Sequence, residues 1–484
     1  MTHSDRIEFS QVRAGDLARA VATRVEHGMR FGGLVASAEQ PAGGGVYALL
    51  LDQDGIHVLV AHIPPGTSTS ANSGMSLPSL TRSVPAAEWY ERKIHDIHGF
   101  APDGHPHLHP LTTAGAASAP SHVSGEGMFT IPYGPVRSGV FEAVEYLLET
   151  PGEEIPSLDV GIHPKHRGIE SRFVGATIPD GVLLAERIEG VASVAHAMAF
   201  CQAVERICAA HVPLKAAHLR VLHAELERIA NHLDVAIRLS EAAGLAVANA
   251  RFGIHKERVM RFRAQLCGNR FGRGVVIPGG VEHPVSSSAS GLLPVLQGLA
   301  HDVLSDTEAA LGTPSFVDRL RGTGVLDTGT AKYLGSIGPI ARASGIAEDV
   351  RVDRPYASYE ELGPLRPATR DSGDALGRME VRYDELDVSF KLAAKALGEV
   401  AGLSGSHLEH LEVHDGRSIG WAEGPHGEIL TLVDIEAGRV KAVLPRTASF
   451  HNLSILPRVF RGDILTDFAF IEASFGLSIA GASL

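Results

Sequence analysis

The sequence predicts an α+β protein, in which a small N-terminal α+β domain precedes a large, mainly helical domain with peripheral β-hairpins. In the first part, β-like runs at 45–51 and 56–62 flank a turn at Asp52–Gly55, which predicts a hairpin. In the second part, apolar residues recur at helical spacing over long stretches. These stretches are 185–210, 214–243, 249–267 and 292–320.

An amphipathic stretch at 16–27 predicts a helix in the N-terminal part. Residues 111–130 are small and polar without apolar periodicity, so we expect a linker there. The predicted domains are therefore 1–110 and 131–484.

The second domain begins with β-like runs at 131–135 and 140–148. They predict a β-hairpin that closes near residues 151–153, where Pro and Gly occur together.

Composition narrows the class of protein. The chain has 484 residues and a formal net charge of -13, which argues against a nucleic-acid or anionic-membrane surface. The three cysteines form no CxxC pair, so we expect neither a cysteine-based metal site nor a disulfide framework. The N-terminus lacks the apolar core of a signal peptide, and no apolar run is long enough to span a membrane. We expect a cytoplasmic protein that meets a membrane only through partners.

The segment 163–205 contains a His-Pro-Lys-His-Arg-Gly cluster and the motif Arg187-Ile-Glu-Gly-Val-Ala192. It resembles the large subunit of NiFe hydrogenases and the related 49-kDa subunit of respiratory complex I. Further matches in the same order extend the resemblance over nearly the whole chain; among them are 338–345, 420–432 and 449–452.

The N-terminal part carries a second resemblance. Glu88–Phe100, EWYERKIHDIHGF, and the following Gly104-His105-Pro106 resemble the C-terminal signature of the 30-kDa subunit of complex I. Energy-converting hydrogenases often carry that module fused ahead of the large subunit, so the resemblance implies this type of chain.

In the hydrogenases, four cysteines from two CxxC motifs bind the NiFe centre. The matching positions in this chain are Glu189, Ala192, Ser478 and Gly481. Because nickel redox chemistry depends on soft thiolates, we expect no metal at these positions and no hydrogenase activity. The resemblance implies no cofactor held by this chain itself, with a 4Fe-4S cluster in a partner small subunit and a quinone as a further candidate.

Six residues form the predicted proton- and electron-coupling cavity. They are Glu142, Arg167, Glu170, Arg187, Glu189 and His196. The resemblance places Arg167 near the partner's iron–sulfur cluster and Glu142 near the glutamate that relays protons in hydrogenases. Glu189 and His196 are seven residues apart and would share a face of a helix spanning 185–210. Arg187 or Arg167 would then compensate the charge of Glu189.

Three functions remain open. The first is a subunit of a membrane-associated complex I-like or energy-converting-hydrogenase-related oxidoreductase, active in electron transfer and proton coupling. It would lie on the inner face of the cell membrane, with an iron–sulfur small subunit and membrane-arm subunits as partners and no nucleic acid. The second is an NADH-quinone oxidoreductase-type subunit with a rearranged quinone site, because the family's quinone-contact positions hold Ser138, Gly190 and Ala242. The third is a non-catalytic scaffold.

Overall fold

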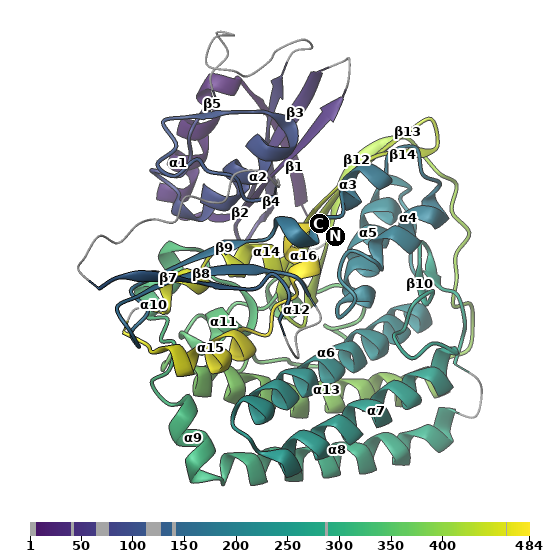
Figure 1. The fold of residues 1–484 in the computed structure, drawn as a ribbon. Helices are drawn as coiled ribbons and strands as arrows, with labels where there is room; N and C mark the ends of the chain where they lie inside the picture. The colour runs from purple at the N-terminus through teal and green to yellow at the C-terminus, as the bar shows by residue number, and fades with distance from the viewer. Residues whose placement is uncertain are drawn as a thin grey trace.

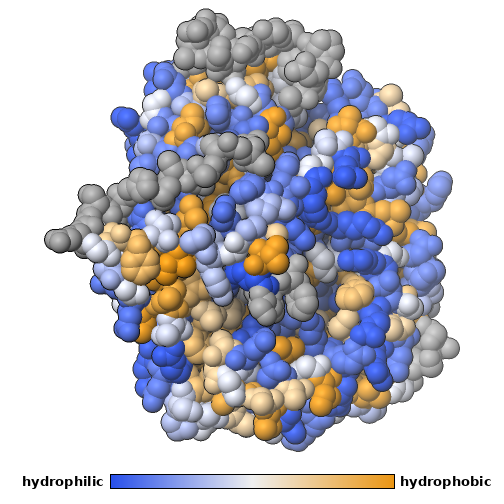
Figure 2. Space-filling model, in the orientation of Figure 1, coloured by the Kyte–Doolittle hydropathy of each residue, from blue (hydrophilic) through white to orange (hydrophobic). Residues whose placement is uncertain are grey.

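The computed structural model gives the chain two parts, with the N-terminal domain above a layer of long helices (Figure 1). The residues that it describes are 6–39, 43–63, 77–112, 127–137, 142–285, 289–460 and 462–484. Within these residues, no helix combines the length and apolar character needed to cross a bilayer. The face drawn in Figure 2 is mostly hydrophilic, with apolar residues scattered over it.

The N-terminal domain is built on a four-stranded sheet with the order β1-β4-β3-β2. Its strands are β1 (Arg6–Val12), β2 (Arg30–Glu39), β3 (Gly43–Leu51) and β4 (Gly55–Ile63), with β1 parallel to β4 and the other pairs antiparallel. The predicted hairpin is confirmed, and Oδ1 of Asp52 accepts the backbone N–H groups of Asp54 and Gly55 at 2.9 and 3.0 Å. Gly55 is required because a Cβ there would lie 2.1 Å from the carbonyl oxygen of Arg6.

Two helices complete this domain. They are α1 (Leu17–Glu26) and α2 (Glu88–His98). The first confirms the amphipathic prediction, since Leu17 and Val21 are buried one turn apart. A short parallel pair, β5 (Leu77–Pro78) and β6 (Pro102–Asp103), lies beside them.

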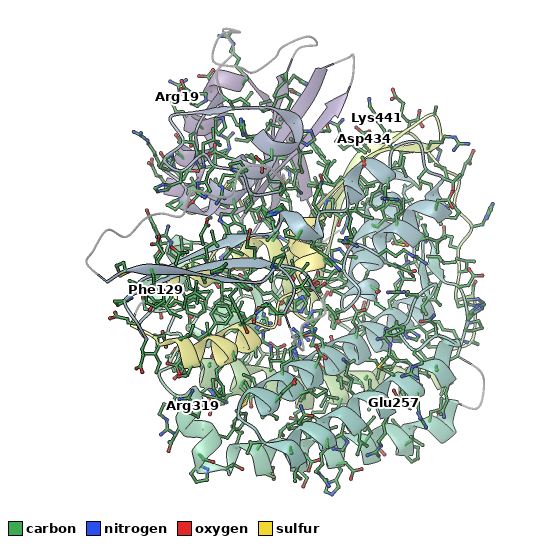
Figure 3. All side chains as sticks on the ribbon, in the orientation of Figure 1. Arg19, Phe129, Glu257, Arg319, Asp434 and Lys441 are labelled. Atoms are coloured by element: carbon green, nitrogen blue, oxygen red, sulfur yellow. The ribbon has the colours of Figure 1, made fainter. Side chains whose placement is uncertain are left out.

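The helical layer confirms the helices predicted at 214–243 and 249–267. Its members are α6 (Leu214–Ala242), α7 (Ala246–Cys267), α8 (Ala289–Leu311), α9 (Pro314–Leu320) and α13 (Ala375–Gly402). Of these, α13 was not predicted. The stretch 292–320 is two helices, because Gly312 and Thr313 interrupt it and Pro314 starts α9. Glu257 on α7 and Arg319 on α9 lie on the outside of this layer (Figure 3).

The prediction of one helix over 185–210 is wrong. The structure has α4 (Ile178–Ala185) and α5 (Ser193–Ile207), with a turn between them. Gly190 lies in this turn and weakens helix continuation. The carboxylate of Glu227 then accepts the first N–H groups of α5, which lets a new helix begin.

Two antiparallel sheets flank the helices. The first contains β7 (Phe129–Tyr133), β8 (Glu145–Thr150) and β9 (Ser157–Gly161). The predicted pairing of the first two runs is confirmed, because β7 pairs antiparallel with β8. The predicted position of the closing turn is wrong, because residues 151–153 lead from β8 to β9. The linker predicted at 111–130 falls mainly on 113–126, outside the described residues, and its last residues belong to β7.

The second sheet was not predicted from periodicity. It contains β12 (Gly416–Gly424), β13 (Gly427–Glu436) and β14 (Arg439–Arg446). Nine successive residues of β13 are buried, so the alternation that marks a half-exposed strand is missing. This sheet packs on α5, and Gly420 is required there because a Cβ would lie 1.8 Å from the carbonyl oxygen of Ala199.

Shorter elements close the structure. They are α3 (Ile169–Arg172), β10 (Val276–Ile277), β11 (Gly280–Val281), α10 (Thr328–Tyr333), α11 (Gly338–Ala343), α12 (Val350–Asp353), α14 (Ala448–Leu453), α15 (Phe468–Phe475) and α16 (Ile479–Ser483). The C-terminal helix α16 lies inside the molecule below α3 (Figure 1). Leu484, which follows α16, is 2% exposed, and its backbone carbonyl oxygen accepts the N–H groups of Arg167 and Gly168 at 3.1 Å.

Candidate functional site

Glu189 lies at the centre of a buried polar cluster between α4 and α5. Oε1 accepts the hydroxyl of Ser449 at 2.6 Å and lies 2.7 Å from Nδ1 of His426. Oε2 lies 3.2 Å from Nε2 of His196. All four side chains are 2% exposed or less. A carboxylate, two imidazoles and a hydroxyl therefore meet without contact to solvent.

The C-terminal helix covers this carboxylate. A Cβ at Gly481 would lie 2.7 Å from Cδ of Glu189, so the carboxylate occupies the space beside that glycine. Ser478 approaches from the same helix, and its backbone N–H donates to Oγ of Ser449 at 3.2 Å. Three of the four positions that match the hydrogenase cysteines thus converge here, and the fourth, Ala192, is buried in the turn before α5.

The ionisation of Glu189 follows from its neighbours. Burial acts to raise its pKa, but the charge of His426 and hydrogen bonds from both histidines outweigh burial and hold the pKa well below its usual range. Of the two expected arginine partners, Arg167 acts on Glu189 through its charge, although its hydrogen bonds go to backbone carbonyl oxygens, and Arg187 does not contact Glu189. Arg187 is half exposed and donates to the carbonyl of Leu183 instead.

Asn231 extends the cluster toward α6. Its Nδ2 lies 3.1 Å from Nε2 of His426, so Nε2 accepts and the ring proton is on Nδ1, facing Glu189. Oδ1 of Asn231 is buried and has no hydrogen-bond partner among the described residues. Rotation of the amide would present this oxygen to Nε2 instead.

Two more of the predicted residues hold the C-terminal helix. Glu142 accepts the backbone N–H groups of Ile479 and Ala480 at 2.6 and 3.1 Å, and the hydroxyl of Ser478 at 3.1 Å. It therefore caps the start of α16. Arg167 donates to the carbonyl oxygens of Ile188 and Ala480 at 2.7 and 2.8 Å, which ties the Glu189 turn to the same helix.

Glu170 belongs to a different contact. It forms an ion pair of 2.8 Å with Lys93 of α2, which joins the N-terminal domain to α3. The structure thus gathers Glu142, Arg167, Glu189 and His196 around α16, and leaves Glu170 and Arg187 outside.

Sequence reasoning did not find four members of the cluster. They are Glu227, Asn231, His426 and Ser449. Glu227 and Asn231 are four residues apart on α6, so they share a face of that helix, and this spacing was an available signal. Burial raises the pKa of Glu227 to about 7, whereas that of Glu189 is depressed. Two nearby carboxyl groups whose pKa values are driven apart are typical of sites that move protons.

The residues at the four cysteine-matched positions do not fit a NiFe centre. They offer one carboxylate and one hydroxyl and no thiolate, and the carboxylate is already fully hydrogen-bonded. The thiols lie elsewhere: Cys201 is buried against the carbonyl of Val276, and Cys267 at the end of α7 faces the carbonyl of Arg263. Among the described residues, no group of three His, Cys, Asp or Glu side chains is arranged to hold a metal ion.

Comparison with known proteins identifies the family. Residues 248–407 match the model of the respiratory-chain NADH dehydrogenase 49 Kd subunit, and residues 34–122 match that of the 30 Kd subunit. The membrane-bound hydrogenase subunit alpha of Pyrococcus furiosus is 30% identical over 362 residues, which cover 71% of this chain and 84% of the relative. This chain belongs to the superfamily of NiFe hydrogenase large subunits and complex I 49-kDa subunits.

Other members of the superfamily show a similar level of sequence identity to this chain. The carbon monoxide-induced hydrogenase of Rhodospirillum rubrum is 28% identical over 351 residues, and the matched region covers 72% of this chain and 96% of the hydrogenase. An NADH-quinone oxidoreductase subunit of Salinispora arenicola is also 28% identical, and the matched region covers 70% of this chain and 90% of that subunit. A chain of the membrane-bound sulfane sulfur reductase, an archaeal respiratory membrane complex, has the same fold, with a TM-score of 0.69, 24% identity, and coverage of 74% of this chain and 99% of that chain. The predicted family and fold class are confirmed, and the relatives are subunits of oxidoreductases.

Proposed function

We propose that this chain is a proton-coupling subunit of a membrane-associated oxidoreductase complex related to complex I and to energy-converting hydrogenases, and that it works without a NiFe centre. The observation that carries the proposal is the carboxylate of Glu189, which lies beside Gly481 and is held by two histidines and a serine. In place of thiolates, these positions present a group that stabilises a proton on a neighbouring imidazole.

The proton-accepting atom in this proposal is a ring nitrogen of His426 or His196, and Glu189 is the charge that stabilises the resulting imidazolium. Nδ1 of His426 is 2.7 Å from the carboxylate, within the distance of a charge-assisted hydrogen bond. A negative charge that arrives nearby during electron transfer raises the proton affinity of these rings. In a buried site this interaction is only weakly screened, so proton uptake follows electron arrival closely.

The partners proposed for this role are an iron–sulfur small subunit, which would carry a 4Fe-4S cluster, and membrane-arm subunits. Support comes from the relatives, which include a membrane-bound hydrogenase and a respiratory membrane complex. Arg167 would face the partner's cluster beyond α16. The complex would then lie on the inner face of the cell membrane, and this chain would contact the membrane through its partners.

The test is Glu189→Gln in the assembled complex, with electron transfer and coupled ion movement measured together. Gln keeps the shape of the side chain but removes the charge that stabilises an imidazolium. We expect assembly to be normal and coupled turnover to fall by about a hundredfold, the lower end of what proton-transfer groups contribute. Glu91→Gln is the matched control, because Glu91 is also buried and hydrogen-bonded but lies in the N-terminal domain.

Full coupled turnover in the Glu189→Gln complex would favour the scaffold function instead. Stoichiometric nickel in the purified complex, retained through dialysis against a chelator, would contradict the absence of a NiFe centre. Quinone reduction at this position receives no support, because Gly190 and Ala242 offer no hydrogen-bonding side chain and Ser138 lies outside the described residues.

A further inference from the structure

A two-residue loop joins the Glu189 cluster to a second buried cluster. Pro425 and His426 connect β12 to β13, and Glu423 and Glu428 face each other on the two strands next to the loop. The three ionisable side chains of this hairpin, those of Glu423, His426 and Glu428, contact different partners. His426 contacts Glu189, Glu423 contacts Arg342, and Glu428 contacts Arg446 and Arg30.

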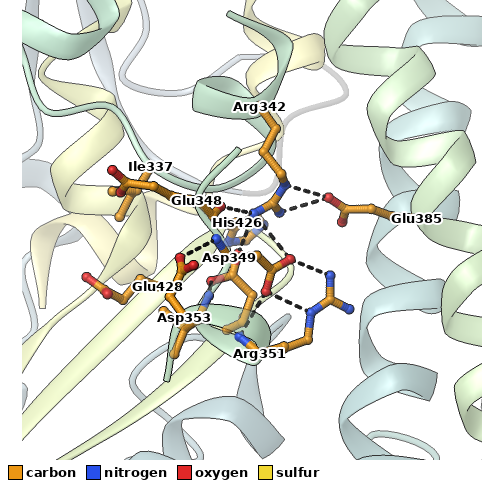
Figure 4. Close-up of polar contacts among 12 residues, drawn as sticks. Ile337, Arg342, Glu348, Asp349, Arg351, Asp353, Glu385, His426 and Glu428 are labelled. Atoms are coloured by element: carbon orange, nitrogen blue, oxygen red, sulfur yellow. Dashed lines mark hydrogen bonds and ion pairs between the residues drawn. The ribbon is translucent and has the colours of Figure 1, made fainter. Parts of the chain in front are cut away.

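The cluster reached by Glu423 contains more carboxylates than cations. Its members, all buried, are the carboxylates Glu225, Asp349, Glu385 and Glu423 and the guanidinium groups Arg228, Arg342 and Arg351. Figure 4 shows Arg342 and Arg351 reaching the acids from separate elements. His232 lies 2.8 Å from Glu385, but burial lowers its pKa to about 4, so it adds no charge near neutral pH. Four carboxylates thus contact three cations.

The other groups that face the cluster do not supply the missing positive charge by direct contact. Arg382 of α13 acts on Glu385 only at longer range, and its guanidinium binds the carbonyl oxygens of Arg378 and Phe475. Tyr359 and Ser389 donate hydrogen bonds to Glu225 at 2.5 and 2.6 Å, and the hydroxyl of Tyr356 accepts the backbone N–H of Glu423.

Within the cluster, Glu423 is the least compensated acid. Among the residues that the structure describes, its one charged contact is Nη1 of Arg342 at 3.0 Å, and it also accepts the backbone N–H of Val350 at 3.3 Å. Arg342 in turn contacts Glu385 at 2.8 Å and Asp349 at 3.5 Å. Each of the other three acids contacts a further arginine. Glu428 lies directly opposite Glu423 in the strand pairing, where like charges disfavour each other.

We propose that Glu423 is a second buried proton-binding site, which carries the proton that balances the four-carboxylate cluster and exchanges it in step with the Glu189–His426 pair. The step is the formation or loss of one O–H bond on the Glu423 carboxylate, with no change in electrons. Only Gly424 and Pro425 separate Glu423 from His426 along the chain, and in this proposal a proton on one would lower the proton affinity of the other across the buried loop. The link to the Glu189 pair rests on the proposed function, whereas the proton on Glu423 does not.

Burial and the neighbouring Asp349 raise the pKa of Glu423 to about 7, which agrees with this geometry. By contrast, the charges of Arg30 and Arg446 overcome the effect of burial on Glu428 and lower its pKa to about 2. Near neutral pH, Glu428 is therefore ionised, whereas Glu423 is in the range where it exchanges its proton.

Infrared difference spectroscopy of the full-length chain, between about pH 5.5 and about pH 8.5, tests the proton directly. The C=O stretch of a protonated carboxylic acid should lose intensity with a midpoint near neutral pH. Glu423→Gln should remove one such component. Glu227→Gln is the matched control, because it should remove a different component and leave that of Glu423 in place. A Glu423→Gln spectrum identical to that of the wild type would overturn the assignment.

Two further variants keep the outcome decisive. If Glu423→Gln does not fold, Glu423→Asp retains a carboxyl and should shift the position and midpoint of the same component, and an unshifted component overturns the proposal. In Glu189→Gln the midpoint should fall by roughly half a pH unit, since a nearby negative charge is removed. An unchanged midpoint overturns the link to Glu189 but not the proton on Glu423, and neither result depends on turnover of the complex.

Discussion

The missing side chain of Gly481 decides where the Glu189 carboxylate lies. Gly481→Ala would place a methyl group 2.7 Å from Cδ and Oε2 of Glu189, well inside van der Waals contact. The carboxylate must then move away from its histidines and Ser449. Overpacking in a core usually costs about 1–3 kcal/mol, and we expect a loss of about 2 kcal/mol in the free energy of unfolding, measured by urea denaturation.

The control for this variant is Gly298→Ala. Gly298 lies in helix α8 with open space around its Cα, so a methyl group there should stabilise the protein by about 0.5–1 kcal/mol. Equal stabilisation by both substitutions would show that the Glu189 carboxylate is not packed against α16.

Helix α5 depends on a side chain from another helix. Glu227 of α6 accepts the N–H groups of Val194 and Ala195 at 2.8 and 3.0 Å, and burial raises its pKa to about 7. The folded protein therefore holds a proton that the unfolded chain has already released above its ordinary pKa of 4.5. The stability from this proton is complete at low pH and is lost as the pH rises through about 7.

Glu227→Gln removes this titration but keeps an oxygen for the first turn of α5. Between about pH 5 and about pH 8.5, we expect the wild type to lose roughly 1–3 kcal/mol relative to the variant, as followed by denaturant unfolding at several pH values. Parallel pH profiles for the two proteins would mean that Glu227 is ionised throughout.

At the scale of single helices and strands, the local sequence pattern predicted α1, α6, α7 and the β3–β4 hairpin, because each has a clear apolar period or turn sequence. It failed for the turn that carries Glu189. The apolar residues on both sides of Gly190 continue the helical period, and the helix break depends on Glu227, some forty residues away. The β12–β14 sheet was also missed, since burial on both faces removes the alternation.

Across the whole molecule, the order of motifs predicted the family, but not which groups would replace the thiolates. His426 and Ser449 lie in segments that resembled the family, yet only the fold brings them to Glu189. The contacts between the domains were equally invisible to sequence, because they join residues hundreds of positions apart. The rings of Tyr90 and Phe450 are 4.9 Å apart, and one hydrophobic cluster contains side chains from both domains.

The shared hydrophobic core leads to a prediction about proteolysis at the expected linker. Protease should cut first within 111–130, where the sequence is small and polar. The two fragments should nevertheless stay together in size-exclusion chromatography, because buried contacts cross the boundary.

Polar contacts also join the two domains. The Tyr90 hydroxyl is 2.7 Å from Nδ1 of His451, and Arg30 pairs with Glu428 at 2.6 Å. Tyr90→Ala removes the ring and the partner of Nδ1 of His451, so the nicked variant should release its N-terminal fragment more readily than the nicked wild type. Separation of the wild-type fragments immediately after cleavage, or a first cut within 185–243, would contradict this domain arrangement.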